Sequence, residues 1–128
     1  MKKIISVLIF IVSISCTSNL SKNDATIHFE DPEFYFGTIP YKKEKIHRFQ
    51  FLNPGESPII VYDVKTSCGC AVPEWPRRPI KPKSGGEIVV KYDASSPGMF
   101  HKEIRVFYNG PESPAVLQIR GQVEYPEQ

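Results

Sequence analysis

The sequence lacks an excess of charge of either sign. Its 128 residues include 16 Lys and Arg against 14 Asp and Glu. Lys2 and Lys3 lie in a leader that we expect to be removed, which leaves 14 basic side chains against 14 acidic ones. Because a neutral surface cannot neutralise a row of phosphates, the composition excludes a nucleic-acid partner.

Motifs of the common catalytic classes are also missing. The sequence contains no glycine-rich phosphate loop, no nucleophile elbow and no HExxH helix. Its carboxylates, such as Asp63, Asp93 and Glu103, are scattered without a spacing that would pair them for acid–base chemistry. The sequence therefore predicts a protein that is not an enzyme and that holds no cofactor.

The longest apolar run is too short to anchor the chain as a membrane-spanning helix. It covers Ile4 to Ile14, interrupted only by Ser6 and Ser13, and it follows Lys2 and Lys3. Eleven residues of helix span about 16 Å, whereas a hydrocarbon core is about 30 Å thick. A short basic start followed by such a run is typical of a secretory signal, so we expect residues 1–15 to be a signal peptide.

The end of this leader resembles a bacterial lipobox. In Ser13-Ile14-Ser15-Cys16-Thr17, a small residue precedes a cysteine. The resemblance implies that Cys16 becomes the acylated N-terminus and that the membrane is a partner through this lipid. A lipobox prefers Leu where this chain has Ser13, so cleavage by an ordinary signal peptidase near Ser15 is the alternative.

The lipobox predicts an exported lipoprotein of the bacterial cell envelope, facing the periplasm. Several acyl chains on one residue hold a protein on a membrane persistently, whereas a single chain is marginal. Residues 16–25 then comprise the lipidated cysteine and a tether of small and polar residues without periodicity, which is typical of a flexible linker.

Residues 26–128 show period-two alternation instead of a helical period. Apolar residues alternate with their neighbours in, for example, Phe49-Gln50-Phe51 and Ile104-Arg105-Val106. Such alternation indicates half-buried strands, and clusters of Gly, Pro, Asn and Ser between them indicate turns. We expect strands at Thr26–Phe29, Phe34–Ile39, Lys45–Leu52, Ile59–Thr66, Cys68–Pro73, Glu87–Tyr92, Phe100–Tyr108 and Pro114–Tyr125.

Seven to eight short strands in about 100 residues predict an all-β, immunoglobulin-like antiparallel sandwich. The two cysteines of this part, Cys68 and Cys70, are too close in sequence to form the inter-sheet disulfide of antibody domains. The fold must therefore depend on the burial of Phe, Tyr, Ile and Val side chains.

Four strings resemble the bacterial domain-of-unknown-function family 1573. They are Phe36-Gly37-Thr38-Ile39, Phe49-x-Phe51-x-Asn53-x-Gly55, Ser67-Cys68-Gly69-Cys70-x-Val72-Pro73-Glu74-Trp75-Pro76 and Gly121-x-Val123. The resemblance runs from about Asp31 to Val123. It implies a small exported protein, often a lipoprotein, with a fold similar to pilus-chaperone and sperm-protein domains. It transfers no catalytic residue.

Cys68-Gly69-Cys70 is the one constellation that could carry chemistry. In an extended strand the two thiols would lie on the same side and could reach one partner atom. With Cys16 consumed by lipid, the remaining pair is even, and an oxidising compartment favours a disulfide. Full extension places residues two apart near the upper limit for a bridge, although a turn at Gly69 would relieve this.

Other interpretations of Cys68 and Cys70 remain open. The pair could be structural, it could exchange thiols, or it could bind Cu(I) or part of a zinc site. His28, His47, His101 and Met99 have no ligand spacing to the cysteines, and the histidines occupy polar positions that indicate the surface. We therefore predict no metal site, with Cys68 and Cys70 as the alternative ligands.

Trp75 is the only tryptophan and stands beside Arg77 and Arg78 in a proline-rich segment. Trp and Arg are enriched in interaction hot spots, so these three residues are candidates for contact with a partner. The alternative is that Trp75 covers one end of the core.

These features together predict a non-enzymatic binding module of the envelope. Its partner would be an envelope protein or peptide, bound at sheet edges or end loops. The alternative is a thiol-redox or Cu(I)-handling protein that uses Cys68 and Cys70.

Overall fold

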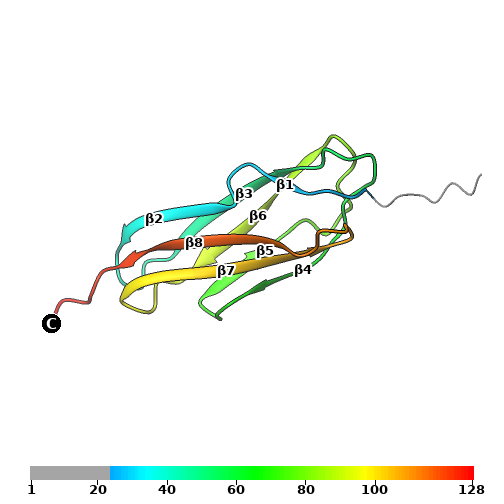
Figure 1. Ribbon diagram of the computed structural model, residues 1–128. Coiled ribbons are helices and arrows are strands. Elements are labelled where there is room, and N and C mark those ends of the chain that lie inside the picture. The colour runs from blue at the N-terminus through cyan, green and yellow to red at the C-terminus, as the bar shows by residue number, and fades with distance from the viewer. Residues whose placement is uncertain (1–23) are drawn as a thin grey trace, which may run out of the picture.

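The computed structural model describes residues 24–128, which form eight strands in two packed sheets (Figure 1). The immunoglobulin-like sandwich expected from alternation is confirmed. The strands are β1 (His28–Phe29), β2 (Glu33–Ile39), β3 (Lys45–Leu52), β4 (Val61–Thr66), β5 (Ala71–Glu74), β6 (Gly85–Tyr92), β7 (Gly98–Tyr108) and β8 (Ala115–Val123).

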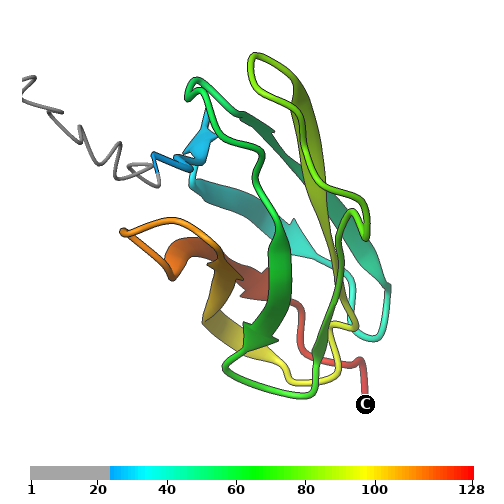
Figure 2. The same ribbon diagram turned by 90° about the vertical axis from the view of Figure 1, so that its right-hand side faces the viewer.

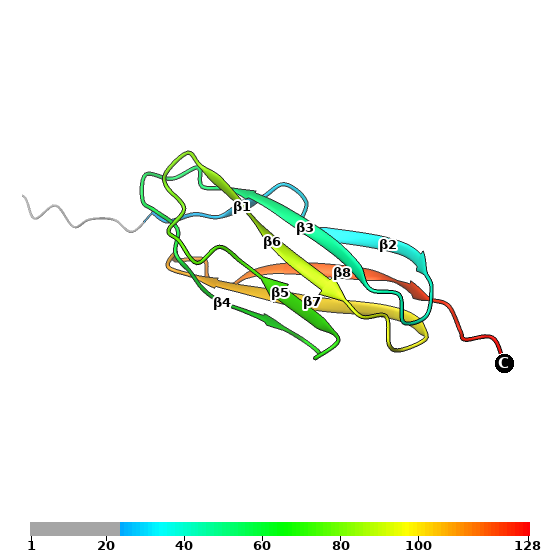
Figure 3. The same ribbon diagram turned by 180° about the vertical axis from the view of Figure 1, so that it is seen from behind.

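The chain changes sheets between β1 and β2. The first sheet has the order β1-β3-β6-β5, and the second has the order β2-β8-β7-β4 (Figures 1 and 3). All pairs are antiparallel except β2 and β8, which are parallel. This pair departs from the antiparallel pattern expected for the sandwich. Alternation predicts strands but not which distant strand each one pairs with.

The core lies between the sheets and is built from the inward-facing residue of each alternating pair. Burial of each large apolar side chain contributes about 1.5–3 kcal/mol. Tyr92 and Phe100 stack across the sheets with ring centroids 4.2 Å apart. Gly86 is opposite Phe51 in the register, and an added Cβ there would lie 2.7 Å from the ring, so glycine makes room for the core. The fully buried apolar residues include Phe49, Ile59, Ile88, Val90, Ile104, Val106, Leu117, Ile119 and Val123.

Most predicted strands agree with the structure, but the strand predicted at Cys68–Pro73 is wrong at its start. β5 begins at Ala71, and the cysteines lie in the turn before it. The strand predicted from Ile59 begins later as well, because Ile59 forms an isolated bridge with Ile80. This bridge holds the proline-rich segment against the sandwich.

The sandwich has two poles, which lie at the right and left ends of the view in Figure 1, and Figure 2 looks along the long axis with the right-hand pole toward the viewer. The right-hand or proximal pole contains Asp24 and the loops 53–57 and 109–113. The left-hand or distal pole contains the turns at 40–43 and 93–97 and the C-terminal end. The N-terminal and C-terminal ends of the described chain therefore lie at opposite poles.

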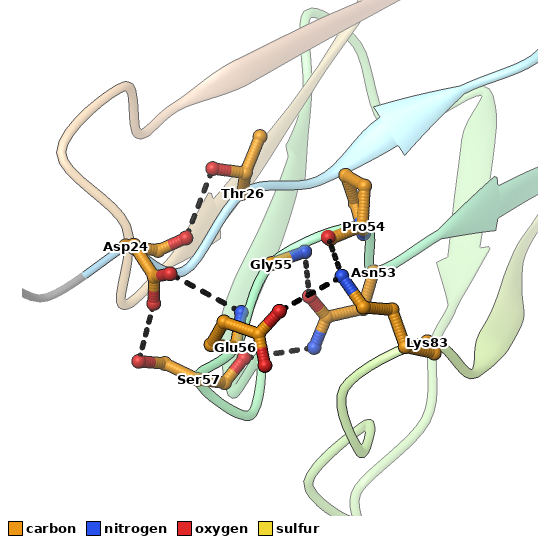
Figure 4. A network of polar contacts seen from close by, with 8 residues as sticks. All are labelled: Asp24, Thr26, Asn53, Pro54, Gly55, Glu56, Ser57 and Lys83. Atoms are coloured by element: carbon orange, nitrogen blue, oxygen red, sulfur yellow. Dashed lines mark hydrogen bonds and ion pairs between the residues drawn. The ribbon is translucent and has the colours of Figure 1, made fainter.

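A polar network fixes Asp24 to the proximal pole (Figure 4). Its carboxylate accepts hydrogen bonds from the Ser57 hydroxyl at 2.6 Å and from the Glu56 backbone N–H at 3.2 Å. These bonds hold the pKa of the Asp24 carboxyl below its ordinary value of 3.8. Lys83 closes the same loop by donating to the Pro54 carbonyl at 2.6 Å and pairing with Glu56 at 3.1 Å.

Residues 24–128 contain every strand described above and the buried core, so this part of the chain has what it needs to fold on its own. None of its residues forms a helix of the length and apolarity needed to cross a bilayer.

Candidate functional site

Cys68 and Cys70 form a disulfide that closes the turn between β4 and β5. Their Cα atoms are 5.3 Å apart. The Thr66 hydroxyl donates to the Cys68 carbonyl at 2.7 Å, and the Asp93 N–H donates to the Cys70 carbonyl at 3.0 Å. The expectation of two thiols on one side of an extended strand is therefore wrong, because the chain turns at Gly69.

Both cysteines of this turn are half-buried and pack against the core, whereas Gly69 is exposed. The bond to Asp93, which follows β6, places the turn toward the distal pole. No set of three or more His, Cys, Asp or Glu side chains within residues 24–128 is arranged to hold a metal ion. The thiol-exchange and Cu(I) interpretations of the pair remain predictions.

His28 and His101 are exposed as predicted, whereas His47 is half-buried and lines a surface recess, so the surface position predicted for it is met only in part. The His47 ring stacks on Phe34 at 3.6 Å between centroids and meets Phe49 edge-on at 4.6 Å. Burial lowers the pKa of His47 below 6.5, and the nearby charge of Asp31 opposes this shift.

The sequence did contain a signal for this placement of His47. His47, Phe49 and Phe51 have the same parity in β3, and both phenylalanines are buried. The His47 ring of β3, in the first sheet, contacts Phe34 of β2, in the second sheet, and so closes the sandwich on the side where these two strands lie.

Trp75 is half-buried and packs against the core, which agrees with a cover over the sandwich. The Arg77 guanidinium lies 3.9 Å from the ring centroid, so the structure brings these two predicted residues together. Arg78 is exposed. The buried Trp75 Nε1 finds no hydrogen-bond acceptor within residues 24–128. A role of Trp75, Arg77 and Arg78 in partner binding remains a prediction.

The outer face of the second sheet carries a groove that the sequence interpretation missed. It has a volume of about 490 Å³ and includes Tyr35, Met99, Arg120 and Gln122 in its lining. Tyr35 of β2 is paired with Arg120 of β8, and Met99 of β7 is paired with Gln122 of β8. Three strands therefore contribute to one hollow near the distal pole.

Two apolar side chains of this groove extend into solvent. Met99 is 90% exposed and Tyr35 is 64% exposed. Alternation in β2 places Tyr35 outward, so that residue could have been found from sequence. Its proximity to Met99 could not, because it depends on the pairing of β2, β8 and β7.

Polar contacts hold the floor of the groove in place. The Arg120 guanidinium lies 3.9 Å from the Glu33 carboxylate. His101 Nε2 and Gln118 Oε1 are 2.6 Å apart across β7 and β8. These contacts leave a shallow surface of mixed character, apolar at Tyr35 and Met99 and polar between them.

The signal peptide predicted at residues 1–15, the lipidation predicted at Cys16 and most of the tether lie outside the described residues.

The family model described as "Protein of unknown function (DUF1573)" matches residues 27–123. No curated protein matches the chain. Similar solved structures include the ASH/PapD-like domain of human CEP192, with a TM-score of 0.68 and 8% identity over 82% of this chain and 89% of that one.

Two further similar structures are a protein of unknown function and a chaperone. A protein of unknown function from Porphyromonas gingivalis has a TM-score of 0.66 and 16% identity, covering 84% of this chain and 51% of that one. The YadV chaperone has a TM-score of 0.51 and 16% identity, covering 79% and 52%. At such identities the likeness shows the fold alone, which is immunoglobulin-like and PapD-like.

Proposed function

Because the chain belongs to the DUF1573 family, whose description assigns no activity, we propose its function from the groove: a non-enzymatic module that binds an envelope protein or peptide. The observation that carries the proposal is the exposure of Tyr35 and Met99 around the hollow of about 490 Å³. Tyr combines a large apolar area with a polar tip, and Met adapts its shape to a partner. Their joint exposure suits recognition of an apolar side chain on an extended segment.

The polar floor of the groove supports the same ligand class. Arg120 offers a guanidinium to a carboxylate or backbone carbonyl, and Gln122 offers an amide. An extended peptide presents both kinds of group along its backbone. The PapD-like fold is compatible with a binding module of this kind.

Site-specific photo-crosslinking tests this function. A photoreactive amino acid replaces Met99 in the full-length protein in cells, and Tyr62 of β4 provides the matched control because it is 63% exposed. We expect crosslinked envelope proteins at position 99 and not at position 62. Equal labelling at both positions, or none at position 99 across several growth conditions, would count against the groove.

We also propose that the protein is exported to the cell envelope and that a lipid on Cys16 holds it on a membrane there. The folded domain would then face the periplasm. The support is the lipobox-like segment Ser13-Ile14-Ser15-Cys16-Thr17, followed by a tether that meets the folded domain at Asp24. Mass spectrometry of the native N-terminal peptide tests this, with Cys16→Ser as the control. An unmodified peptide that begins just after Ser15 would show ordinary secretion instead.

A second candidate function is thiol exchange or Cu(I) handling by Cys68 and Cys70. The observation that favours it is the disulfide's position in a turn outside any strand, beside an exposed glycine. Measurement of the pair's reduction potential separates this function from a structural role. A value below about −300 mV fits a stable structural bond, whereas a markedly higher value fits exchange chemistry.

A further inference from the structure

One edge of the second sheet is open along a whole strand. β2 pairs with β8 on one side, and among residues 24–128 no strand pairs with its other side. The adjacent edge of the first sheet is also uncovered over most of its length, because β1 pairs with β3 only at Phe51 and Leu52. An unpaired row of backbone N–H and C=O groups is a template for another strand.

The other sheet edges carry features that discourage such pairing. β1 has only two residues, and β5 contains Pro73, which has no N–H to donate. β4 has a register shift between Val61 and Asp63 and presents Lys65. Bulges and lysines are recognised edge-protecting devices.

β2 offers weaker protection than these edges. It contains no Pro and no Lys, although like β4 it has one register shift, between Tyr35 and Thr38, where Gly37 has a positive φ of 73°. Gly37 lies within that shift, and a Cβ added there would meet nothing within 4 Å. No other part of residues 24–128 therefore crowds the strand at that position.

Charges at the two ends of β2 are of opposite sign. Three acidic residues precede or begin the strand, and three lysines follow it, with Glu44 as the only opposing charge among them. Within residues 24–128, no ion pair involves Glu30, Asp31, Lys42 or Lys43. The acidic residues are Glu30, Asp31 and Glu33, and the lysines are Lys42, Lys43 and Lys45.

We propose that β2 pairs antiparallel with β2 of a second copy of this chain, which makes the edge a self-association surface. This inference goes beyond the binding function proposed above. A two-fold axis perpendicular to the sheet relates two copies of one strand that run in opposite directions. The acidic end of each copy then meets the basic end of the other, and the symmetry makes this contact twice.

The acidic end also has a place for a lysine side chain. A recess of about 180 Å³ there has Glu30, Asp31 and Glu33 among its lining residues. Arg48 also lines it, but its guanidinium is bonded to Glu87 at 2.7 Å. Lys42 or Lys43 of the second copy would enter this recess as the chains pair. The two sheets would join into one of eight strands, with both grooves on the same face.

Sedimentation velocity of residues 24–128 tests the proposal between about 10 µM and about 1 mM. We expect a monomer at the low end, a dimer at the high end, and a weaker dimer as salt is raised. Glu30→Lys with Asp31→Lys places like charges at both contacts, and Lys42→Glu with Lys43→Glu does the same with the other sign. Each double variant should weaken association about tenfold or more.

An equal mixture of the two double variants should associate again, because each supplies the charge that the other lost. Lys65→Glu with Arg105→Glu is the matched control: it reverses two basic residues on β4 and β7, on the side of the sheet opposite the β2 edge, and should leave the dimer unchanged. Thermal unfolding of each variant verifies that it is folded.

A monomer at every concentration overturns the proposal, as does a mixture that fails to associate. Charge-reversed variants that dimerise like the unaltered protein also overturn it. A monomer that still gives crosslinks at Met99 would refute self-association and leave the binding function standing.

Discussion

Within residues 24–128, Asn53 is the only buried residue with an amide or charged side chain, at 0% exposure, and its replacement gives the sharpest test of how the proximal pole is held. Its amide donates to the carbonyls of Ser57 at 2.9 Å and Ile80 at 3.0 Å, and its oxygen accepts from the Gly55 N–H at 3.1 Å. At about 1 kcal/mol net per bond, and more for a partner left unsatisfied, we expect Asn53→Ala to cost about 2–4 kcal/mol. That corresponds to roughly 10–25 °C in melting temperature for a domain of this size.

Asn53→Asp separates the amide donors from the shape of the side chain. At pH 7 its carboxylate would have no proton to donate and would face the two carbonyl oxygens, so we expect a loss at least as large as in Asn53→Ala. Burial raises the pKa of such a carboxyl, so the folded state binds the extra proton. The defect should therefore shrink as pH falls toward the ordinary value of about 3.9.

Urea unfolding at several pH values measures both Asn53 variants. Gln122→Ala, at an exposed position, is the control and should stay within about 0.5 kcal/mol of the unaltered protein. If Asn53→Asp unfolded at the same urea midpoint as the unaltered protein at pH 7, the donated hydrogen bonds would not be what holds the loop.

Three further predictions concern single sites. Burial lowers the pKa of His47, so as pH falls the unfolded chain takes up a proton before the folded protein does, and the free energy of unfolding should fall below pH 6.5. His47→Phe should remove this part of the pH dependence and no other, as measured by urea unfolding from about pH 7.5 to 5. Replacing Cys68 and Cys70 together by Ser should cost less than about 2 kcal/mol, because the closed loop is so short, and an unfolded variant by circular dichroism would contradict this. Gly121→Ala should cost about 1–3 kcal/mol in thermal unfolding, because the new Cβ would lie 2.7 Å from the Gly37 carbonyl oxygen and 2.9 Å from the Phe100 ring. An unchanged melting temperature would contradict this.

The sandwich could be predicted because its evidence is local. Each strand alternates between the core and solvent, and a turn residue marks where it stops, as at Asn53-Pro54-Gly55 after β3. The clearest local failure was the segment where a covalent bond and a glycine override the pattern. Cys68 and Cys70 have the spacing of one strand face, but the disulfide turn leaves them outside β5.

The groove and the open edge could not be predicted, because both depend on which strands are neighbours. Tyr35 and Met99 are far apart in the sequence and meet only through β8. His47 shows the opposite case: its parity in β3 indicated burial, but its polar chemistry suggested the surface. The stack on Phe34 resolves the conflict, because an uncharged imidazole can pack as an aromatic ring.

The parallel pairing of β2 with β8 would have a mechanical consequence if the proposed lipid anchor held the domain at its proximal pole while a ligand occupied the groove. Tension between Asp24 and a ligand near the distal end of β8 pulls the two strands along their length in opposite directions. Bonds such as Gln118 N–H to Pro32 O at 2.8 Å and Glu124 N–H to Ile39 O at 2.9 Å are then loaded together in shear. They must break in concert, so this geometry resists force better than a hairpin that opens one pair at a time.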